Sequence, residues 1–417
     1  PAAGKSLADI EKVIRDTLVE FEQRGVEDDD LLKVKAEMEA SFVFGLQSVS
    51  GKVSQLAANQ TFSNNPNYIA QDIARYNNVT KEDVMRVFKK YIKDQHGVIM
   101  SVVPTGQLSS IAAKDSFVPG PRNAGNESST SADDVAVRKG VDDFDRSLIP
   151  VAGANKAVDI PEMWQHSFDN GISILGAQSV ETPTTSVLLK IPAGHYYTTK
   201  NKAGTAGLVV SMFRESTTER SAEDMSKALQ KLGSSVYISA GNRYLNINIS
   251  SLTKNLDATL SLVNEQLRAP AFLESEFERV KNNAIQGALN NKKDAGYLAS
   301  TAYRQLLNAD NIAAMPSSGS EESLTNISLE DVKAFYQQQV KPFGGQLIAV
   351  SDLGQAELTK SLSILENWQG KGAGLQLSLP EGNGKMGAIY LVNKDDAAQS
   401  VIRIGKRSMT QDITGEY

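Results

Sequence analysis

Apolar residues recur at helical spacing in two distant parts of the chain. The first part carries "VEDDDLLKVKAEMEASF" from Val26 and the second "FLESEFERVKNNAIQGAL" from Phe272, which align at an offset of 280 − 34 = 246. The helices expected just before them keep this offset and the spacing of one buried face. Their matched apolar positions are Ile10, Ile14 and Phe21 in the first copy and Leu256, Leu260 and Leu267 in the second.

A further pair of helices follows in both copies. "NVTKEDVMRVFKKY" from Asn78 matches "NISLEDVKAFYQQQ" from Asn326 at an offset of 326 − 78 = 248. Each begins with an S/T-x-x-D signal, in which a hydroxyl and a carboxylate bind free amides of the first turn. Each copy then ends in an expected strand, "GVIMSVVPTG" or "GQLIAVSDLG". We therefore expect residues 7–106 to repeat the elements of residues 253–354 in the same order.

The second copy is preceded by elements that the first copy lacks. From Trp164 the chain shows two β-rich runs around a Thr-Pro turn, then helices from Gly204 and Ser221, then the strands "SSVYISAG" and "RYLNINISSL". The predicted order of the whole unit is β-β-α-α-β-β-α-α-α-β. This order predicts an α+β fold of repeated two-layer units, with a largely antiparallel sheet and helices packed on one face.

The pattern divides the chain into four parts. Residues 1–108 read as the carboxy-terminal half of a unit, and 109–160, rich in Gly, Ser, Asp and Pro, as a linker. Residues 161–356 read as a complete unit. Residues 357–417 read as a connection and the first strands of a further unit, because "KMGAIYLVNKDDAAQSVIRIG" repeats the strand, turn and strand of residues 171–191. Incomplete units leave sheet edges free, so a homo-oligomer is among the expectations.

Composition excludes several classes of function. The net charge of −6 and the pI near 5.4, without a run of Lys and Arg among aromatic residues, argue against a nucleic-acid partner. No apolar run approaches the ~18 residues of a membrane span. The chain has no cysteine, which excludes disulfides, thiolate nucleophiles and sulfur-ligated metal. It begins at Pro1, so we expect a processed or excised piece whose signal segment lies outside this sequence.

Several segments resemble the pitrilysin or insulinase family of zinc metallopeptidases, the inverted zincins. They are "NGISIL", "PAGHYYTTKNKAGTAGL", "ESTTERSAEDMSKALQKLG", "FDRSLIP" and "AAQSVIRIG". "FDRSLIP" before a new unit resembles the bacterial members in which one long chain holds four units. The resemblance implies a fold of pitrilysin-type units and places this chain at the centre of such a protein, with a non-catalytic third unit.

The residues of that family's catalytic motif are replaced by others in this sequence. In catalytic units a helix beginning Gly-x-Ala carries His-x-x-Glu-His, whose histidines bind zinc and whose glutamate takes a proton from the metal-bound water. In "GTAGLVVSMF", Gly207 and Ser211 stand at the histidine positions and Val210 at the glutamate. Gln286 and Gly287 stand where the resemblance implies a later glutamate ligand. We therefore expect no catalytic residue, no metal ligand and no bound zinc in this segment.

Other candidates for chemistry have simpler interpretations. His96, His166 and His195 each lack a second histidine or a carboxylate at helical spacing, so we expect surface or strand-end histidines. "GNGKMG" near Gly382 precedes a strand, which favours a turn over a phosphate loop. No G-x-S-x-G elbow offers a serine nucleophile.

Two hypotheses of function follow from the resemblance. In the first, the chain is the central segment of a periplasmic or cell-envelope zinc metalloendopeptidase, and forms chamber wall and hinge for hydrolysis done elsewhere in the parent chain. Its partners would then be a peptide or small-protein substrate and the remaining units of the parent. In the alternative, it is a non-catalytic family member that acts as a scaffold or partner subunit.

Overall fold

The computed structural model describes residues 6–114, 161–375 and 387–405, together with residues 116, 120, 145, 147, 148 and 153. The chain forms two compact units. Unit 1 contains residues 1–27 and 80–160, and unit 2 contains residues 28–79 and 161–417.

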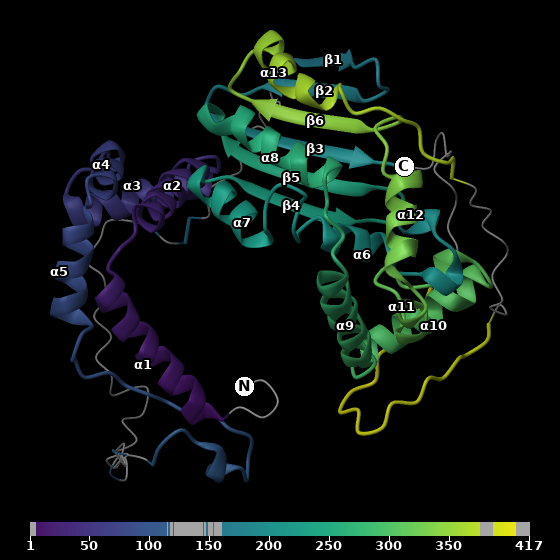
Figure 1. Cartoon of the computed structure of the whole chain (residues 1–417), viewed down its shortest axis with the longest axis horizontal. Coiled ribbons are helices and arrows are strands. Elements are labelled where there is room, and N and C mark those ends of the chain that lie inside the picture. Colours follow the sequence, from purple (N-terminus) through teal and green to yellow (C-terminus); the bar gives the residue numbers. More distant parts are fainter. Residues whose placement is uncertain are drawn as a thin grey trace. The chain divides into compact units, whose positions relative to one another are not determined.

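Unit 2 is built on one six-stranded sheet with the strand order β1-β2-β6-β3-β5-β4 (Figure 1). β6 pairs in parallel with β2 and antiparallel with β3, and all the other neighbours are antiparallel. The last strand in sequence therefore lies inside the sheet. The strands are β1 (Met163–Ser167), β2 (Ser173–Gln178), β3 (Thr184–Ile191), β4 (Ser235–Ala240), β5 (Leu245–Leu252) and β6 (Gln346–Ser351).

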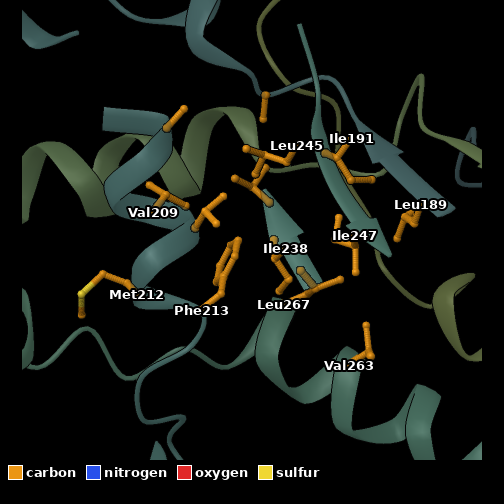
Figure 2. Packing of buried hydrophobic residues seen from close by; sticks show 14 of the residues in the cluster. Leu189, Ile191, Val209, Met212, Phe213, Ile238, Leu245, Ile247, Val263 and Leu267 are labelled. Atoms are coloured by element: carbon orange, nitrogen blue, oxygen red, sulfur yellow. The ribbon is translucent and has the colours of Figure 1, made fainter. Parts of the chain in front are cut away.

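The core lies between one face of this sheet and the helices that cover it. Along β3, β5 and β6 alternate residues are buried, whereas on the other face Ile348 and Val350 are 40% and 43% exposed. Figure 2 shows the ring of Phe213, directly after α6, beside Ile238 of β4. The covering helices include α6 (Thr205–Met212), α8 (Leu256–Arg268) and α12 (Leu329–Gln339). The predicted α+β class with a largely antiparallel sheet is confirmed.

Both edge strands of the sheet are held by side chains. In β1, Trp164 lies opposite Gly176 of β2, and a Cβ on Gly176 would come within 2.1 Å of the indole ring. A glycine is needed there because the ring occupies the space of a side chain. In β4, the Arg214 guanidinium lies 5.2 Å from the Tyr237 ring centre and donates a 2.5 Å hydrogen bond to the carbonyl oxygen of Ile238.

Two of the five helix pairs in the repeated segments begin and end at matching residues. α2 (Asp28–Gly45) and α9 (Glu274–Asn291) differ by 246 at both ends, 274 − 28 and 291 − 45. α5 (Lys81–Tyr91) and α12 differ by 248 at both ends, 329 − 81 and 339 − 91. The remaining helices in the same order are α1 (Leu7–Arg24), α3 (Val49–Ser63) and α4 (Ile69–Asn77), against α8, α10 (Ala295–Asn308) and α11 (Glu321–Thr325).

The expected helix starts are confirmed. Thr80 accepts a hydrogen bond from the amide of Asp83, whose carboxylate binds the amide of Thr80 in return. Ser328 and Asp331 form the same reciprocal pair at the start of α12. Each start satisfies amides that would otherwise lack a partner, so these four residues fix where both helices begin.

Unit 2 contains more elements than expected. Three strands precede α6, because residues 163–167 form β1, and five helices lie between β5 and β6, because α10 and α11 were not expected. α11 is capped by a reciprocal bond between Ser320 and Ser323, so "SSGSEES" ends in a helix start. Two further helices are α7 (Ala222–Lys231), capped by Ser221 as expected, and α13 (Gln355–Leu362).

Two expected strand regions form no ladder. Residues 97–103 and the two runs in 387–405 are irregular, so those predictions were wrong as secondary structure. β6, the counterpart of residues 98–103, is hydrogen-bonded on both sides, by β2 and β3. No described residue pairs with 98–103 in this way, and Val98, Met100 and Val102 are 100%, 81% and 82% exposed. A strand without a neighbour is not stable.

Unit 1 is a small helical pair. The rings of Phe21 in α1 and Phe88 in α5 meet edge to face at 5.0 Å, and Lys93 pairs with Glu22 at 2.6 Å. The first contact buries Phe88, but Val13 and Ile14 of α1 remain 60% and 57% exposed. The predicted buried face of α1 is therefore only partly covered within unit 1.

The domain boundaries predicted at residues 108, 160 and 356 stay a prediction, because the compact units group the chain by contacts and not by repeat. The predicted linker, 109–160, lies largely outside the described residues, and so does Gly382. Among the described helices, none has the length and apolarity to cross a bilayer.

The glycine after α7 provides a test of how unit 2 packs. Gly233 has φ +59°, and a Cβ there would lie 2.5 Å from the carbonyl oxygen of Ala36 and 2.9 Å from the Cβ of Ala40, both in α2. We expect Gly233→Ala to lower the free energy of unfolding by about 1–2 kcal/mol or more, because a left-handed backbone disfavours a side chain and α2 must also shift. Urea unfolding measures this change.

Gly287→Ala is the matched control. Gly287 lies inside α9, and a Cβ there meets no atom within 4 Å. That variant should be stabilised by about 0.5–1 kcal/mol, because alanine favours a helix over glycine. Equal effects of the two substitutions would contradict the packing of α2 against α7.

Candidate functional site

The helix α6 exposes a single stripe. Its other residues are buried, but Gly207 and Ser211 are partly accessible and lie one turn apart on the same side. A Cβ built on Gly207 meets no atom within 4 Å, and the hydroxyl of Ser211 donates to the carbonyl oxygen of Gly207 at 3.0 Å. The positions that the resemblance assigned to the two histidines therefore share an open face. Val210, at the glutamate position, is 5% exposed within the core.

The start of α6 is fixed by close packing. Gly204 precedes the helix with φ +104°, and a Cβ there would lie 2.8 Å from Leu324 and 3.2 Å from Gly319. Ser323 donates a 2.8 Å hydrogen bond to the carbonyl oxygen of Ala203, next to this turn. The segment 318–324 thus sets the position at which α6 begins.

Gln286 does not lie on the face of α9 that packs toward the core. Phe277, Val280 and Ala288 are buried, and Ala284 and Ile285 pack against the core, which defines one stripe. Gln286 is exposed and lies about half a turn from Ala284 and Ala288, so it points away from that stripe. Gln286 therefore does not occupy the place of a metal ligand facing α6, and the packed stripe of α9 carries no carboxylate.

The carboxylates nearest to the end of α6 are engaged in structural contacts. Glu276 at the start of α9 accepts a 2.5 Å hydrogen bond from the hydroxyl of Ser216. Glu215 pairs with Arg279 at 2.5 Å. These contacts join the segment after α6 to the first turns of α9, so they maintain the arrangement of the two helices without a metal.

A second cluster of bonds orders the segment before α7. Glu265 of α8 accepts a hydrogen bond from Thr217 at 2.6 Å and pairs with Arg220 at 2.8 Å. The hydroxyl of Thr217 also accepts from the amide of Arg220. Bonding to Glu265 raises the pKa of the Arg220 guanidinium. These bonds hold the segment "STTERSAED" in place between α6, α7 and α8.

The exposed stripe of α6 offers no side chain that could hold a catalytic zinc. A zinc site needs imidazole, thiolate or carboxylate ligands. The exposed stripe offers only the hydrogen of Gly207 and the hydroxymethyl group of Ser211. The residues present do not fit zinc. No three His, Asp or Glu side chains in the described part of the chain come together as a metal-binding group.

The three histidines differ in their surroundings. His96 and His166 are exposed, as expected. His195 is 1% exposed, which the sequence did not predict. Its Nε2 lies 3.2 Å from the carbonyl oxygens of Ile312 and Met315, so this nitrogen donates, and its Nδ1 has no partner. Burial lowers the pKa of His195, and the nearby charge of Arg304 lowers it further, against the two carbonyls, which raise it.

The part of the chain that contains α6 matches a known family model. Residues 174–314 match the family model described as insulinase, peptidase family M16. A non-peptidase homologue, YmxG of Helicobacter pylori, is 27% identical over 185 residues, which are 44% of this chain and 42% of that protein. The mitochondrial-processing peptidase subunit alpha-1 of Dictyostelium discoideum is 26% identical over 107 residues, 26% of this chain and 16% of that protein. The chain thus matches less than half the length of these curated relatives.

Solved structures resemble part of the chain. An inactive peptidase M16 domain from Pseudomonas fluorescens has a TM-score of 0.49 and 21% identity over 53% of this chain and 54% of that one. The periplasmic protease PqqL from Escherichia coli has a TM-score of 0.48 and 18% identity over 54% of this chain and 26% of that one.

Replacing the two stripe residues should create a metal-binding pair. In the double variant Gly207→His, Ser211→His, two imidazoles would share the open face of α6, one turn apart. We expect this variant to bind one zinc weakly in calorimetric titration. The single variant Ser211→His is the control and should bind more weakly still. If the double variant binds no better than the single one, the two positions do not share an accessible face.

His195 should give the stability of the chain a dependence on pH. Its pKa is lower in the folded chain than the ordinary value of 6.5, so the unfolded chain binds more protons between the two values. Its stabilising contribution is therefore full above about pH 6.5 and is lost as the pH falls through the folded pKa.

The measurement is urea unfolding at a series of pH values. His195→Gln should reduce the loss of stability below pH 6.5, the ordinary value, whereas His166→Gln, at an exposed position in β1, should leave that loss unchanged. The same pH profile in His195→Gln and the unmodified chain would show that His195 does not cause it.

Proposed function

We propose that this chain supplies a non-catalytic unit to a zinc metalloendopeptidase. Over residues 174–314 the chain belongs to the insulinase family, peptidase family M16. The zinc, the catalytic glutamate and the hydrolysis of peptides or small proteins would belong to another unit of the parent protein. This chain would contribute chamber wall and hinge.

The open stripe of α6 is the observation that carries this proposal. The face on which a catalytic unit would present its ligands is present and accessible, but it bears Gly207 and Ser211. The surrounding contacts, from Glu276 to Ser216 and from Arg279 to Glu215, maintain the helices without a ligand. A unit that keeps its shape and lacks its ligands is suited to packing and not to chemistry.

The proposed setting is the bacterial periplasm or cell envelope, with the remaining units of the parent chain as partners. A homo-oligomer belongs to the same set of proposals. Fractionation of the source cells tests the location, and light scattering of the purified chain tests the oligomer.

A second candidate function is a scaffold or partner subunit without any link to hydrolysis. The relative YmxG, described as a non-peptidase homologue, favours it. The two candidates differ in one property, namely whether a unit with an intact His-x-x-Glu-His motif works together with this chain. Reading the coding sequence around that of this chain, and its neighbouring genes, for the motif separates them.

We expect the purified chain to cleave no peptide, with or without added zinc, because the stripe of α6 offers no ligand and no proton acceptor. A fluorogenic peptide library and metal analysis measure this. Stoichiometric zinc together with cleavage that a chelator abolishes would overturn the non-catalytic assignment.

The positive arm of the test uses the catalytic unit once its sequence is known. Its peptide cleavage should rise when this chain is joined or added to it, because the chamber is then complete. A catalytic unit that is fully active alone would leave the scaffold function as the better candidate.

A further inference from the structure

Residues 309–316 form a strap in the connection between α10 and α11, within unit 2. The strap contains one 3-10 turn, η6 (Ile312–Ala314), which the side chain of Asn311 caps. Met315 and Pro316, at the end of the strap, line a cavity of about 760 Å³. This volume falls within the range of about 300–1,000 Å³ that small-molecule sites occupy. The strap is therefore part of the wall of a cavity that the proposed function does not use.

A single buried side chain fastens the strap to the body of the unit. His195 lies between β3 and α6 and is 1% exposed. Its Nε2 donates to the carbonyl oxygens of Ile312 and Met315, both at 3.2 Å. Its own amide donates a 2.9 Å hydrogen bond to the carbonyl oxygen of Gly241, in the turn between β4 and β5. The imidazole therefore joins the strap to the sheet layer.

The other described ties of the strap are weak. Asp310 pairs with Lys200, but the two side chains are 88% and 51% exposed, and an exposed ion pair contributes little to stability. Ala313 and Ala314 are buried, but an alanine side chain removes little apolar area from water. The first residue, Ala309, has φ +47°, a conformation that is unfavourable for a residue with a side chain. The closed strap therefore depends on the imidazole.

A second proton on the imidazole is unfavourable while the strap is closed. The Nδ1 of His195 is buried and has no hydrogen-bond partner among the described residues, so a proton there would be an unsatisfied donor. The guanidinium of Arg304 in α10 would repel the new charge. Burial lowers the pKa of His195 most, the two carbonyl oxygens raise it, and Arg304 lowers it. The protonated ring therefore favours a state in which it reaches water.

The other ionisable groups around His195 do not offset this effect. The helices α6 and η6 pack against its turn, and neither has an ionisable side chain. The segment 241–244 adds Arg243 and Tyr244, whose charges act on Tyr197. The bond to its lysine partner lowers the pKa of the aspartate of the strap. That aspartate keeps its charge over the range in which a histidine titrates.

We propose that acid releases the strap and opens this wall of the cavity. A proton taken up at Nδ1 of His195 makes the ring a buried cation, the ring turns toward water, and its two hydrogen bonds to the strap break. Met315 and Pro316 then leave the cavity wall. The N–H bond at Nδ1 is the only covalent bond that forms. The proposal does not rest on the proposed function, because the strap and the cavity are the same whether or not a catalytic unit exists.

The direction of the effect follows from the two states of the strap. Above about pH 6.5, the usual pKa of a histidine, the ring is neutral in both states and the strap is closed. As the pH falls below this value, the open state takes up the proton first. The ratio of open to closed chains then rises by up to about tenfold per pH unit, until the pH reaches the folded pKa of His195.

Oxidation of methionine by hydrogen peroxide tests the proposal in the full chain. Met315 should form its sulfoxide faster at about pH 5 than at about pH 8, because the open strap exposes its sulfur. Met163 in β1, 58% exposed, is the reference for a sulfur that is always accessible, and Met225 in α7, 2% exposed, for one that stays buried. The rate of Met315 relative to that of Met163 should rise about threefold to tenfold, as measured by mass spectrometry of peptides.

Hydrogen exchange shows whether the opening is local. The amides of Ala314 and Met315 are hydrogen-bonded inside the strap. Their protection, corrected for the intrinsic effect of pH on exchange, should fall below pH 6.5, the usual value. It should also be lower at every pH than the protection of the amides of β5, which open only with the whole unit.

Substitutions separate the charge from the packing. His195→Gln keeps a hydrogen-bond donor but does not titrate, so the pH dependence of Met315 oxidation should disappear. His166→Gln, at an exposed position in β1, is the matched control and should keep the full dependence. Arg304→Gln should give a smaller rise than the unmodified chain, because protonation in the closed strap is then less unfavourable.

Three outcomes would contradict the proposal. They are a Met315 oxidation rate with the same ratio to that of Met163 at both pH values, strap amides with the protection of β5, and an unchanged pH dependence in His195→Gln. Far-ultraviolet circular dichroism shows whether each variant folds. If His195→Gln does not fold, the first two outcomes still decide, because they are measured on the unmodified chain.

Discussion

The structure of unit 2 depends on the insertion of β6 between β2 and β3. This strand is separated from β3 by more than 150 residues of sequence, yet it bridges the amino-terminal and carboxy-terminal parts of the sheet. The hydroxyls of Thr185 in β3 and Ser351 in β6 lie 2.6 Å apart at positions with no exposed surface, so the two strands are also joined by side chains. Until β6 is in place, β1 and β2 have no connection to β3, and the helices between β5 and β6 have no fixed return point. The same constraint explains why residues 98–103, which share the sequence pattern of β6, remain irregular in unit 1.

The stability of α6 depends on the same hydrophobic core. Val209, Met212 and Phe213 are buried in the core whether or not the exposed stripe of the helix binds metal, so other residues in the stripe do not destabilise the helix. Only two positions of α6, Gly207 and Ser211, are free to change without disturbing that packing, and they are the two that the resemblance assigns to histidines. In unit 2 the residues that determine shape are therefore different from those that would determine chemistry. The residues of the exposed stripe can be replaced with little loss of stability.

The sequence predicted what depends on local pattern and missed what depends on tertiary contacts. The helix starts at Thr80 and Ser328 were predictable because their capping residues lie within four positions of each other. The open stripe of α6 was predictable as far as the residue types, because it rests on their spacing. The orientation of Gln286 was not, since the position of a residue along the sequence does not fix which side of α9 meets α6. β1 was missed because its stability depends on Trp164 covering Gly176, a contact between strands. The burial of His195 is not predictable from local pattern, because its partners are main-chain carbonyls more than a hundred positions away.

The bond from Arg214 to the outer strand β4 has a consequence for solubility. An outer strand normally presents free carbonyl and amide groups that can recruit a strand from another molecule and start aggregation. Here the carbonyl of Ile238 is already occupied by the Arg214 guanidinium, and the same side chain places a positive charge beside the Tyr237 ring. A foreign strand approaching this edge would have to displace a charged hydrogen bond and leave a cation against its own backbone. The chain thereby carries a charged gatekeeper that discourages growth of its sheet into intermolecular β-structure.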